Sequence, residues 1–239
     1  MINNSLPSYT ELPSAFAITL DNISAITLSG EEQVKYLQGQ VTCDVDKLTD
    51  EKLLNGAHCN AKGKVFSAFR LLARQDKLLL LQKKDSIEQS LAELKKFGVF
   101  AKVEITQDRE HAYLAIVGEQ ASVKLTELFQ QIPDALTPVI QVNDTTLVYL
   151  AGNISRYLII DNIEAISTIS SALKLPVYSS MLWDLLEITA GFPLLSTQYV
   201  GEYVPQMLNL QAINGISFTK GCYLGQETVA RMQYLGKNK

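Results

Sequence analysis

The sequence predicts an α+β fold in which mostly antiparallel sheets pack against helices. Short apolar runs separated by turn residues outnumber the amphipathic stretches that are typical of helices. The two kinds of stretch are interspersed irregularly, whereas parallel α/β proteins alternate them regularly. The chain has 239 residues, of which 47% are hydrophobic, so it can form one large domain or two small ones.

The expected strands are short runs of apolar and β-branched residues bounded by turn residues. Two strands are expected on either side of the turn at 21–22, and two more around the turn at 60–64. The full set of expected strand regions is 15–28, 53–72, 78–81, 99–105, 145–150 and 156–160. The last two regions lie on either side of Gly152, which indicates a hairpin.

Three longer stretches have apolar residues at helical spacing, and we expect helices at 85–97, 163–173 and 180–190. In the last of these, Leu182, Leu185 and Leu186 fall on one face. Gly191 follows directly, and glycine commonly ends a helix.

A strand–glycine–helix pattern occurs twice in the chain. Gly30 follows an apolar strand and precedes a short amphipathic helix, and Gly118 does the same 88 residues later (118 minus 30). Repetition at a fixed offset is typical of related structural units. It predicts two similar halves, at about 14–107 and 108–239.

The composition argues against several classes of function. The net charge of −4 argues against a general nucleic-acid binder, because neutralising phosphates requires clustered Lys and Arg. No apolar run reaches transmembrane length, and the N-terminus has neither the charged nor the apolar region of a signal peptide. We therefore expect a cytoplasmic protein with no membrane partner.

The three cysteines, Cys43, Cys59 and Cys222, are widely scattered and form no Cys-x-x-Cys pair. Disulfide frameworks and zinc or iron–sulfur sites need more ligands at local spacing. His58 lies next to Cys59, but the pair alone does not make a ligand set. We expect no resident metal.

The segment 218–231 places one cysteine at a glycine corner. Ile216 and Phe218 have the pattern of a strand end, and a helix is expected from Leu224 onward. A thiol at a helix N-terminus experiences the positive end of the helix dipole, which favours the thiolate. Cys222 is therefore either a candidate reactive thiol or an inert cysteine in a structural corner, and the residues leave both open.

Several motifs together resemble the YgfZ family, folate-binding proteins related to the aminomethyltransferase T-protein of the glycine cleavage system. Residues 220–227, KGCYLGQE, match the family signature K-G-C-[YF]-x-G-Q-E without a mismatch. Residues 36–44, YLQGQVTCD, match its N-terminal motif. Residues 59–65, CNAKGKV, match its C-x-x-K-G-[RK]-V turn, with Ala61 in place of the usual Pro. The resemblance covers about residues 20–237.

The resemblance implies an aminomethyltransferase-type domain, made of two related halves, that binds tetrahydrofolate or a one-carbon derivative. The C-terminal β-barrel of longer family members is expected to be absent from these 239 residues. The implied function is an accessory one: folate-dependent support of iron–sulfur cluster assembly or repair, with assembly factors or client proteins as partners. An effect on tRNA modification would then be indirect, without direct nucleic-acid contact.

The resemblance also indicates site residues. A carboxylate grips the two N–H donors of a pterin edge in a forked geometry, and Glu187 is the candidate because the related transferases use the corresponding position. The alternative is an ordinary surface glutamate. The remaining candidates for the cofactor site, as stacking rings, tail-binding cations or signature residues, are Trp183, Tyr223, Lys220, Arg231 and Gln226. Cys222, which the transferases lack, is the candidate reactive thiol.

A second hypothesis is a true aminomethyltransferase. Asp85 follows an apolar strand and opens a helix, as the catalytic carboxylate of the transferases does. The transferase segment R-T-G-Y-T-G-E has no full counterpart in residues 150–161, and the Asn-Ala expected before the carboxylate is missing. A carboxylate without its positioning neighbours lacks the geometry that acid–base catalysis requires.

Overall fold

The computed structural model describes residues 2–3, 7 and 11–236. The chain forms two compact units, each assembled from three separate segments. The first unit comprises Met1–Ile23, Asp50–Lys52 and Arg109–Ala190, and the second comprises Ser24–Thr49, Leu53–Asp108 and Gly191–Lys239. These boundaries differ from the halves expected at 14–107 and 108–239, whose relation to each other stays a prediction.

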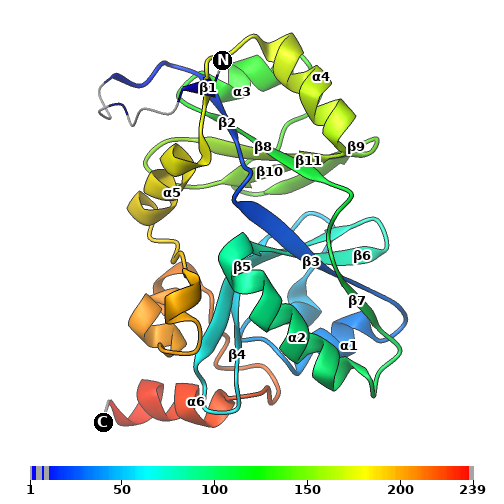
Figure 1. Ribbon diagram of the computed structural model, residues 1–239, viewed down its shortest axis with the longest axis vertical. Coiled ribbons are helices and arrows are strands. Elements are labelled where there is room, and N and C mark those ends of the chain that lie inside the picture. The colour runs from blue at the N-terminus through cyan, green and yellow to red at the C-terminus, as the bar shows by residue number, and fades with distance from the viewer. Residues whose placement is uncertain (1, 4–6, 8–10, 237–239) are drawn as a thin grey trace. The chain divides into compact units, whose positions relative to one another are not determined.

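Each unit contains one sheet with helices packed against it, which confirms the predicted α+β class (Figure 1). The sheet of the first unit is mostly antiparallel, and only the two pairs that involve β12 are parallel. Its strands, in spatial order, are β1 (Ile2–Asn3), β12 (Val177–Tyr178), β2 (Phe16–Thr19), β8 (Ala112–Val117), β11 (Arg156–Asp161), β10 (Thr145–Leu150) and β9 (Val139–Val142). The expected hairpin is β10–β11.

Successive side chains along a strand point to opposite faces of the sheet, and in the first unit each face is covered by different helices. Tyr157 and Ile159 of β11 pack in one cluster with Leu125 of helix α3 (Ala121–Thr126) and Ile166 of helix α4 (Ile163–Leu173). Arg156, one position before Tyr157, points to the opposite face. There it meets helix α5 (Ser180–Thr189).

The sheet of the second unit is covered on both faces. Its strands, in spatial order, are β4 (Leu54–Cys59), β5 (Val65–Arg74), β6 (Lys77–Lys83), β3 (Ile23–Ser29) and β7 (Glu104–Gln107). On one face, Phe69 packs with Leu37 of helix α1 (Gln33–Gln38) and Leu94 of helix α2 (Ile87–Gly98). On the other, Ala57 packs with Val229 of helix α6 (Gln226–Leu235).

The two strand–glycine–helix patterns have the same local structure. Gly30 and Gly118 have φ angles of 118° and 124°, which are left-handed values that favour glycine. A Cβ atom at Gly30 would collide with the carbonyl oxygen of Lys102, and one at Gly118 with that of Ser14. The same two oxygens accept hydrogen bonds from the backbone two residues after each glycine. Helices α1 and α3 then begin three residues after the glycine in both places.

Three local expectations were wrong. Residues 216–218 form no strand, because Ser217 makes a single backbone bond to Thr42 and not a ladder. The last helix begins at Gln226 and not at Leu224, because Gly225 turns with φ 83°. The strand expected at 99–105 begins only at Glu104, since the residues before it form a turn that closes α2.

Within the described ranges, no helix is both long enough and apolar enough to cross a membrane.

His58 lies buried between β4 and α2. Its Nδ1 atom is 2.9 Å from the Ser90 hydroxyl of α2, and the hydroxyl of Ser67 donates to that same oxygen at 3.2 Å. The imidazole has no exposed surface. Burial penalises the charged form and lowers the pKa of His58 to about 3 from an ordinary value of 6.5.

We predict that this buried neutral imidazole makes the protein acid-sensitive. The unfolded chain binds a proton at His58 below about pH 6.5, whereas the folded chain binds it only near pH 3. Stability is therefore fully present above pH 6.5 and falls between 6.5 and 3 by about 1.4 kcal/mol per pH unit. Urea unfolding from pH 7 to 4.5 measures this slope. The fall in unfolding free energy per pH unit should be smaller by about 1.4 kcal/mol, the effect of one proton, in His58→Gln than in the wild type and in the control His111→Gln. Identical slopes in the wild type and His58→Gln would contradict the assignment.

Candidate functional site

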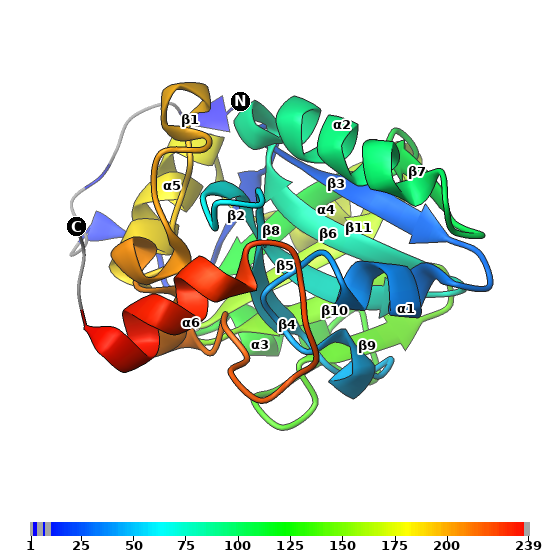
Figure 2. The same cartoon turned by 90° about the horizontal axis from the view of Figure 1, so that it is seen from below.

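Three sequence motifs that lie far apart along the chain meet in the second unit. They are loop 38–44, turn 60–64 and segment 215–226, and we call their meeting place the motif junction. Figure 2 shows segment 215–226, which leads into α6, passing beside the end of α1. The family resemblance therefore rests on residues that form one site in space.

Loop 38–44 and segment 215–226 are joined by backbone hydrogen bonds. The amide of Ser217 donates to the Thr42 carbonyl at 2.8 Å, and the amide of Leu224 donates to the Gly39 carbonyl at 3.1 Å. The buried Thr42 hydroxyl donates to the Gly215 carbonyl at 2.6 Å. Satisfying these buried polar groups fixes the segment against the loop, because an unpaired buried group is costly.

Turn 60–64 approaches segment 215–226 through two glycines. A Cβ atom on Gly63 would lie 2.9 Å from the side chain of Thr228, and one on Gly225 would collide with the Asn60 carbonyl oxygen. Both glycines also have positive φ angles, 71° and 83°. Glycine at these positions is explained by close approach of two backbones.

Lys220 anchors the motif junction from inside. Its side chain is buried, and the ammonium donates to three carbonyl oxygens of loop 38–44: Gln38 at 2.6 Å, Val41 at 2.8 Å and Cys43 at 2.8 Å. Burial lowers the pKa of Lys220 to about 8, and the nearby Cys43, Asp44 and Asp46 oppose that shift because they favour the charged form. An ammonium has three donors, and these bonds use all of them. The structure thus gives Lys220 an anchoring role, and its expected contact with a folate tail stays a prediction.

Tyr223 lies beneath the same ammonium. The centre of its ring is 5.1 Å from Lys220 Nζ, within the range of a cation–π contact. The side chain is buried, and burial raises the pKa of the phenol above its ordinary value. The ring is therefore a packing element of the motif junction in this structure, and its predicted stacking on a pterin stays a prediction.

Cys222 is exposed and makes no disulfide. The helix N-cap is Gly225, so the cysteine lies three residues before the cap. Cys222 was expected directly before the helix, at its N-terminus, but the left-handed Gly225 and the bond from the Gln226 amide to the Tyr223 carbonyl interpose a turn. The alternative of a buried cysteine is wrong, and the reactivity of the exposed thiol stays a prediction.

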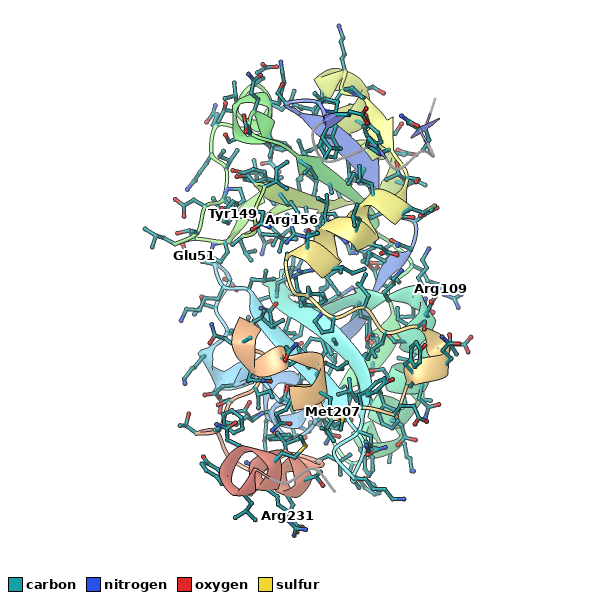
Figure 3. The ribbon with its side chains drawn as sticks, turned by 90° about the vertical axis from the view of Figure 1, so that its left-hand side faces the viewer. Glu51, Arg109, Tyr149, Arg156, Met207 and Arg231 are labelled. Atoms are coloured by element: carbon teal, nitrogen blue, oxygen red, sulfur yellow. The ribbon has the colours of Figure 1, made fainter. Side chains whose placement is uncertain are left out.

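The last two candidates from the C-terminal motif region, Gln226 and Arg231, lie on α6. Gln226 is its first residue and is partly exposed. Arg231 is exposed (Figure 3). Its guanidinium contacts the Glu227 carboxylate, one helical turn earlier, at 2.7 Å. An exposed pair of this kind contributes little to stability, and the expected ligand contacts of Gln226 and Arg231 stay predictions.

Trp183 and Glu187 lie together on α5 in the first unit. The carboxylate of Glu187 is buried, with 1% of its side chain exposed, and it accepts from the Arg156 guanidinium at 2.8 Å. That guanidinium lies 5.3 Å from the centre of the Trp183 ring and also donates to the Ala151 carbonyl at 3.1 Å. The alternative of an ordinary surface glutamate at position 187 is therefore excluded.

Sequence reasoning did not select Arg156 as a site residue. The available signal was an arginine opening a strand whose next four residues, Tyr157 to Ile160, are apolar or aromatic. A charge in such a strand is buried only when it is paired. The structure thus gathers Trp183, Glu187 and Arg156 in the first unit. The candidates that it places in the second unit are Lys220, Cys222, Tyr223, Gln226 and Arg231.

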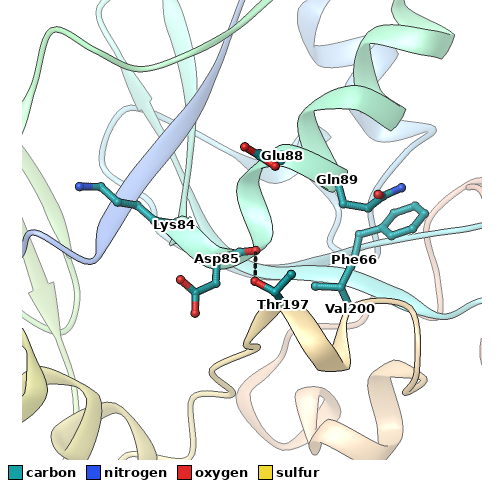
Figure 4. Close-up of a pocket in the computed structure, with 7 residues that line it drawn as sticks. All are labelled: Phe66, Lys84, Asp85, Glu88, Gln89, Thr197 and Val200. Carbon is teal, nitrogen blue, oxygen red and sulfur yellow. Dashed lines mark hydrogen bonds between the residues drawn. The ribbon is translucent and has the colours of Figure 1, made fainter.

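A pocket of about 600 Å³ opens in the second unit beside the start of α2. Its walls combine an aromatic ring, an apolar side chain and several polar groups from α2 and from the turn at Thr197, as Figure 4 shows. The lining residues are Phe66, Lys84, Asp85, Glu88, Gln89, Thr197 and Val200. The Thr197 hydroxyl donates to the Asp85 carbonyl at 3.2 Å, which holds this wall together. Asp85, the residue that the transferase hypothesis selects, is thus a pocket residue.

Among the residues that the structure describes, no three His, Cys, Asp or Glu side chains are grouped so as to hold a metal ion.

The fold is that of the aminomethyltransferases. The crystal structure of the glycine cleavage system aminomethyltransferase T from Bartonella henselae matches with a TM-score of 0.74 at 14% identity. The match covers 92% of this chain but 63% of that protein, so the chain spans just under two thirds of the aminomethyltransferase. Identity this low establishes the fold alone. No protein-family model matches the chain.

Close relatives establish the family. The tRNA-modifying protein YgfZ of Colwellia psychrerythraea is 62% identical over 237 residues, which cover 99% of this chain and 73% of that protein. The protein of the same name from Yersinia enterocolitica is 41% identical over 232 residues, covering 96% and 70%. The chain therefore belongs to the YgfZ family, which confirms the resemblance carried by the motifs.

We predict that one thiol of the three reacts quickly in the native protein. Cys222 is exposed, whereas Cys43 and Cys59 are buried, and burial raises the pKa of the Cys43 thiol to about 12. A thiol reagent of the Ellman type should therefore titrate one fast thiol per chain under native conditions and three in denaturant. Cys222→Ser should abolish the fast reaction, and Cys59→Ser should preserve it. Two fast thiols in the native protein would contradict the burial of the other cysteines.

Proposed function

We propose that the chain binds a reduced folate and acts as an accessory factor in iron–sulfur cluster assembly or repair. The observation that supports folate binding most directly is the pocket at the start of α2, found on an aminomethyltransferase fold. Its lining includes two carboxylates, of Asp85 and Glu88, and the aromatic ring of Phe66, and a pterin is a flat ring with an edge of N–H donors.

The pocket residues match the parts of a pterin. Asp85 and Glu88 supply carboxylate acceptors for its amidine edge, and charge-assisted bonds of this type are strong and directional. The ring of Phe66 and the side chain of Val200 supply an apolar wall for its face. Gln89 adds an amide that both donates and accepts.

The second unit also has the charge to attract the anionic tail of a folate. It contains 16 basic and 12 acidic residues, a net charge of +4, whereas the first unit contains 5 basic and 13 acidic residues, a net charge of −8. Lys84 lines the pocket itself. A local positive field raises the concentration of an anionic ligand near its site.

Glu187 remains a proposed pterin contact, although it lies in the first unit and not at the pocket. Its carboxylate is paired with Arg156 inside the first unit, and removing one partner of a buried pair leaves an uncompensated charge. Glu187→Ala therefore reports on stability as well as on binding. Glu187→Gln, which keeps an acceptor for the guanidinium, separates the two effects.

We predict that the chain binds tetrahydrofolate and that Asp85→Asn and Glu88→Gln each weaken binding by about tenfold, the loss expected for one charge-assisted hydrogen bond. Isothermal titration under anaerobic conditions measures the affinity. Glu104→Gln is the matched control, because Glu104 is an exposed carboxylate of β7 in the same unit, away from the pocket. Wild-type affinity in both pocket variants would remove the pocket from the proposal.

The accessory role is supported by the family and by the exposed thiol. The relatives are named for tRNA modification, and an accessory factor for the iron–sulfur enzymes that modify tRNA would carry that name without binding tRNA. The exposed Cys222 is the proposed reactive group, because thiols handle sulfur and iron transiently.

We predict that this chain restores iron–sulfur enzyme activity in a bacterial strain lacking its own YgfZ protein and that Cys222→Ala does not, although the variant folds and binds tetrahydrofolate as the wild type does. The activity of an iron–sulfur enzyme in cell extract is the measurement. The control is Cys59→Ala, which changes a buried thiol. Full activity with Cys222→Ala would remove the thiol from the proposed function.

The second candidate function is aminomethyl transfer to tetrahydrofolate, which the placement of Asp85 on the pocket wall favours. The two functions are separated by one assay. Purified protein incubated with an aminomethylated carrier protein and tetrahydrofolate releases ammonia only if it is a transferase. Under the accessory function no ammonia above the protein-free rate is expected, and release that depends on Asp85 would establish the second candidate.

A further inference from the structure

Cys222 is an exposed residue on a segment that is fixed on both sides. Two residues before it, the Lys220 ammonium donates to three carbonyl oxygens of loop 38–44. Two residues after it, the amide of Leu224 donates to the Gly39 carbonyl at 3.1 Å. Both anchors hold the same loop, so the three residues between them have little freedom to move.

The residue next to the thiol adds a third restraint. Tyr223 is buried, and its ring lies 5.1 Å from Lys220 Nζ. Exposed loop residues are ordinarily among the most mobile in a protein. Here the exposed Cys222 lies between exposed Gly221 and buried Tyr223, and the anchored Lys220 and Leu224 lie two residues away on either side.

The charge on Lys220 is not needed for packing alone. An apolar side chain of the same length would fill the space, and burying an ammonium is costly unless its hydrogens are bonded. What the ammonium adds is three directed bonds to oxygens contributed by Gln38, Val41 and Cys43. These bonds specify where loop 38–44 lies relative to the thiol.

We propose that Lys220 is a positioning residue for Cys222: its ammonium ties the thiol-bearing segment to loop 38–44 and presents the thiol in one orientation. The restraint is a property of the segment itself. Its importance for activity rests on the proposed function of Cys222.

A spectroscopic label on Cys222 tests the restraint. Because Cys43 and Cys59 are buried, a nitroxide reagent modifies Cys222 alone in the native full-length chain. The electron paramagnetic resonance spectrum should show restricted motion in the wild type and in the control Lys62→Met, which changes an exposed lysine of turn 60–64. In Lys220→Met the lines should narrow, because one anchor of the segment is lost. An unchanged spectrum in Lys220→Met overturns the proposal.

Chemical rescue separates positioning from space filling. In Lys220→Ala, added propylammonium replaces the cation and should restore the restricted spectrum, whereas 1-propanol, of similar size but neutral, should not. Equal rescue by both compounds would show that only volume matters and would overturn the proposal. If Lys220→Met fails to fold, the same comparison in Lys220→Ala refolded with propylammonium decides the question.

The spectra also distinguish this proposal from the proposed function. Lys220→Met should reduce iron–sulfur enzyme activity in the complementing strain to the level of Cys222→Ala. If Cys222→Ala complements fully, the thiol has no role there, and the effect of Lys220 on the label is unaltered. If the label stays restricted in Lys220→Met, Lys220 is not a positioning residue, whatever the result in cells.

Discussion

The three bonds of the Lys220 ammonium are the interaction on which the second unit's motif junction depends. They join residues 177 to 182 positions apart in the sequence. The bonds to Val41 and Cys43 are buried, and the bond to Gln38 is partly buried. Buried hydrogen bonds to a charged group are stronger than neutral ones, but only while every donor is satisfied. The backbone bonds of Ser217 and Leu224 and the glycine contacts of turn 60–64 extend the same junction. One cation thus joins two of the three motifs, and the glycine contacts add the third.

The carboxylates of the two units have contrasting environments. Glu187 is enclosed with Arg156 in the first unit, whereas Asp85 and Glu88 line an open pocket in the second. A buried pair specifies structure, since either charge without the other is destabilising. Carboxylates at an open pocket remain free to exchange water for a ligand's donors. Chemistry with a small molecule is therefore easier to place at the pocket than at Glu187.

Local patterns predicted much of the fold, and the long-range contacts were not predictable. The helix at 163–173 and the hairpin strands follow from periodicity and turn residues, and the structure has both. Periodicity reports local structure and does not indicate which distant residues come into contact. The bonds of Lys220 to residues 177 to 182 positions earlier could therefore not be predicted from it. The start of α6 was misplaced for a related reason. Gly225 turns because a distant glycine, Gly63, leaves room for its backbone.

The interleaved order of the segments has a consequence for synthesis. Loop 38–44 is made early, but segment 215–226 leaves the ribosome more than 170 residues later, which takes roughly ten seconds or more at bacterial rates. During that interval the carbonyls that will surround Lys220 lack their cation, and the second unit is incomplete. The first unit, whose last segment ends at Ala190, is finished sooner. The order of the segments along the chain therefore makes segment 215–226 the last of the three motifs to reach the motif junction.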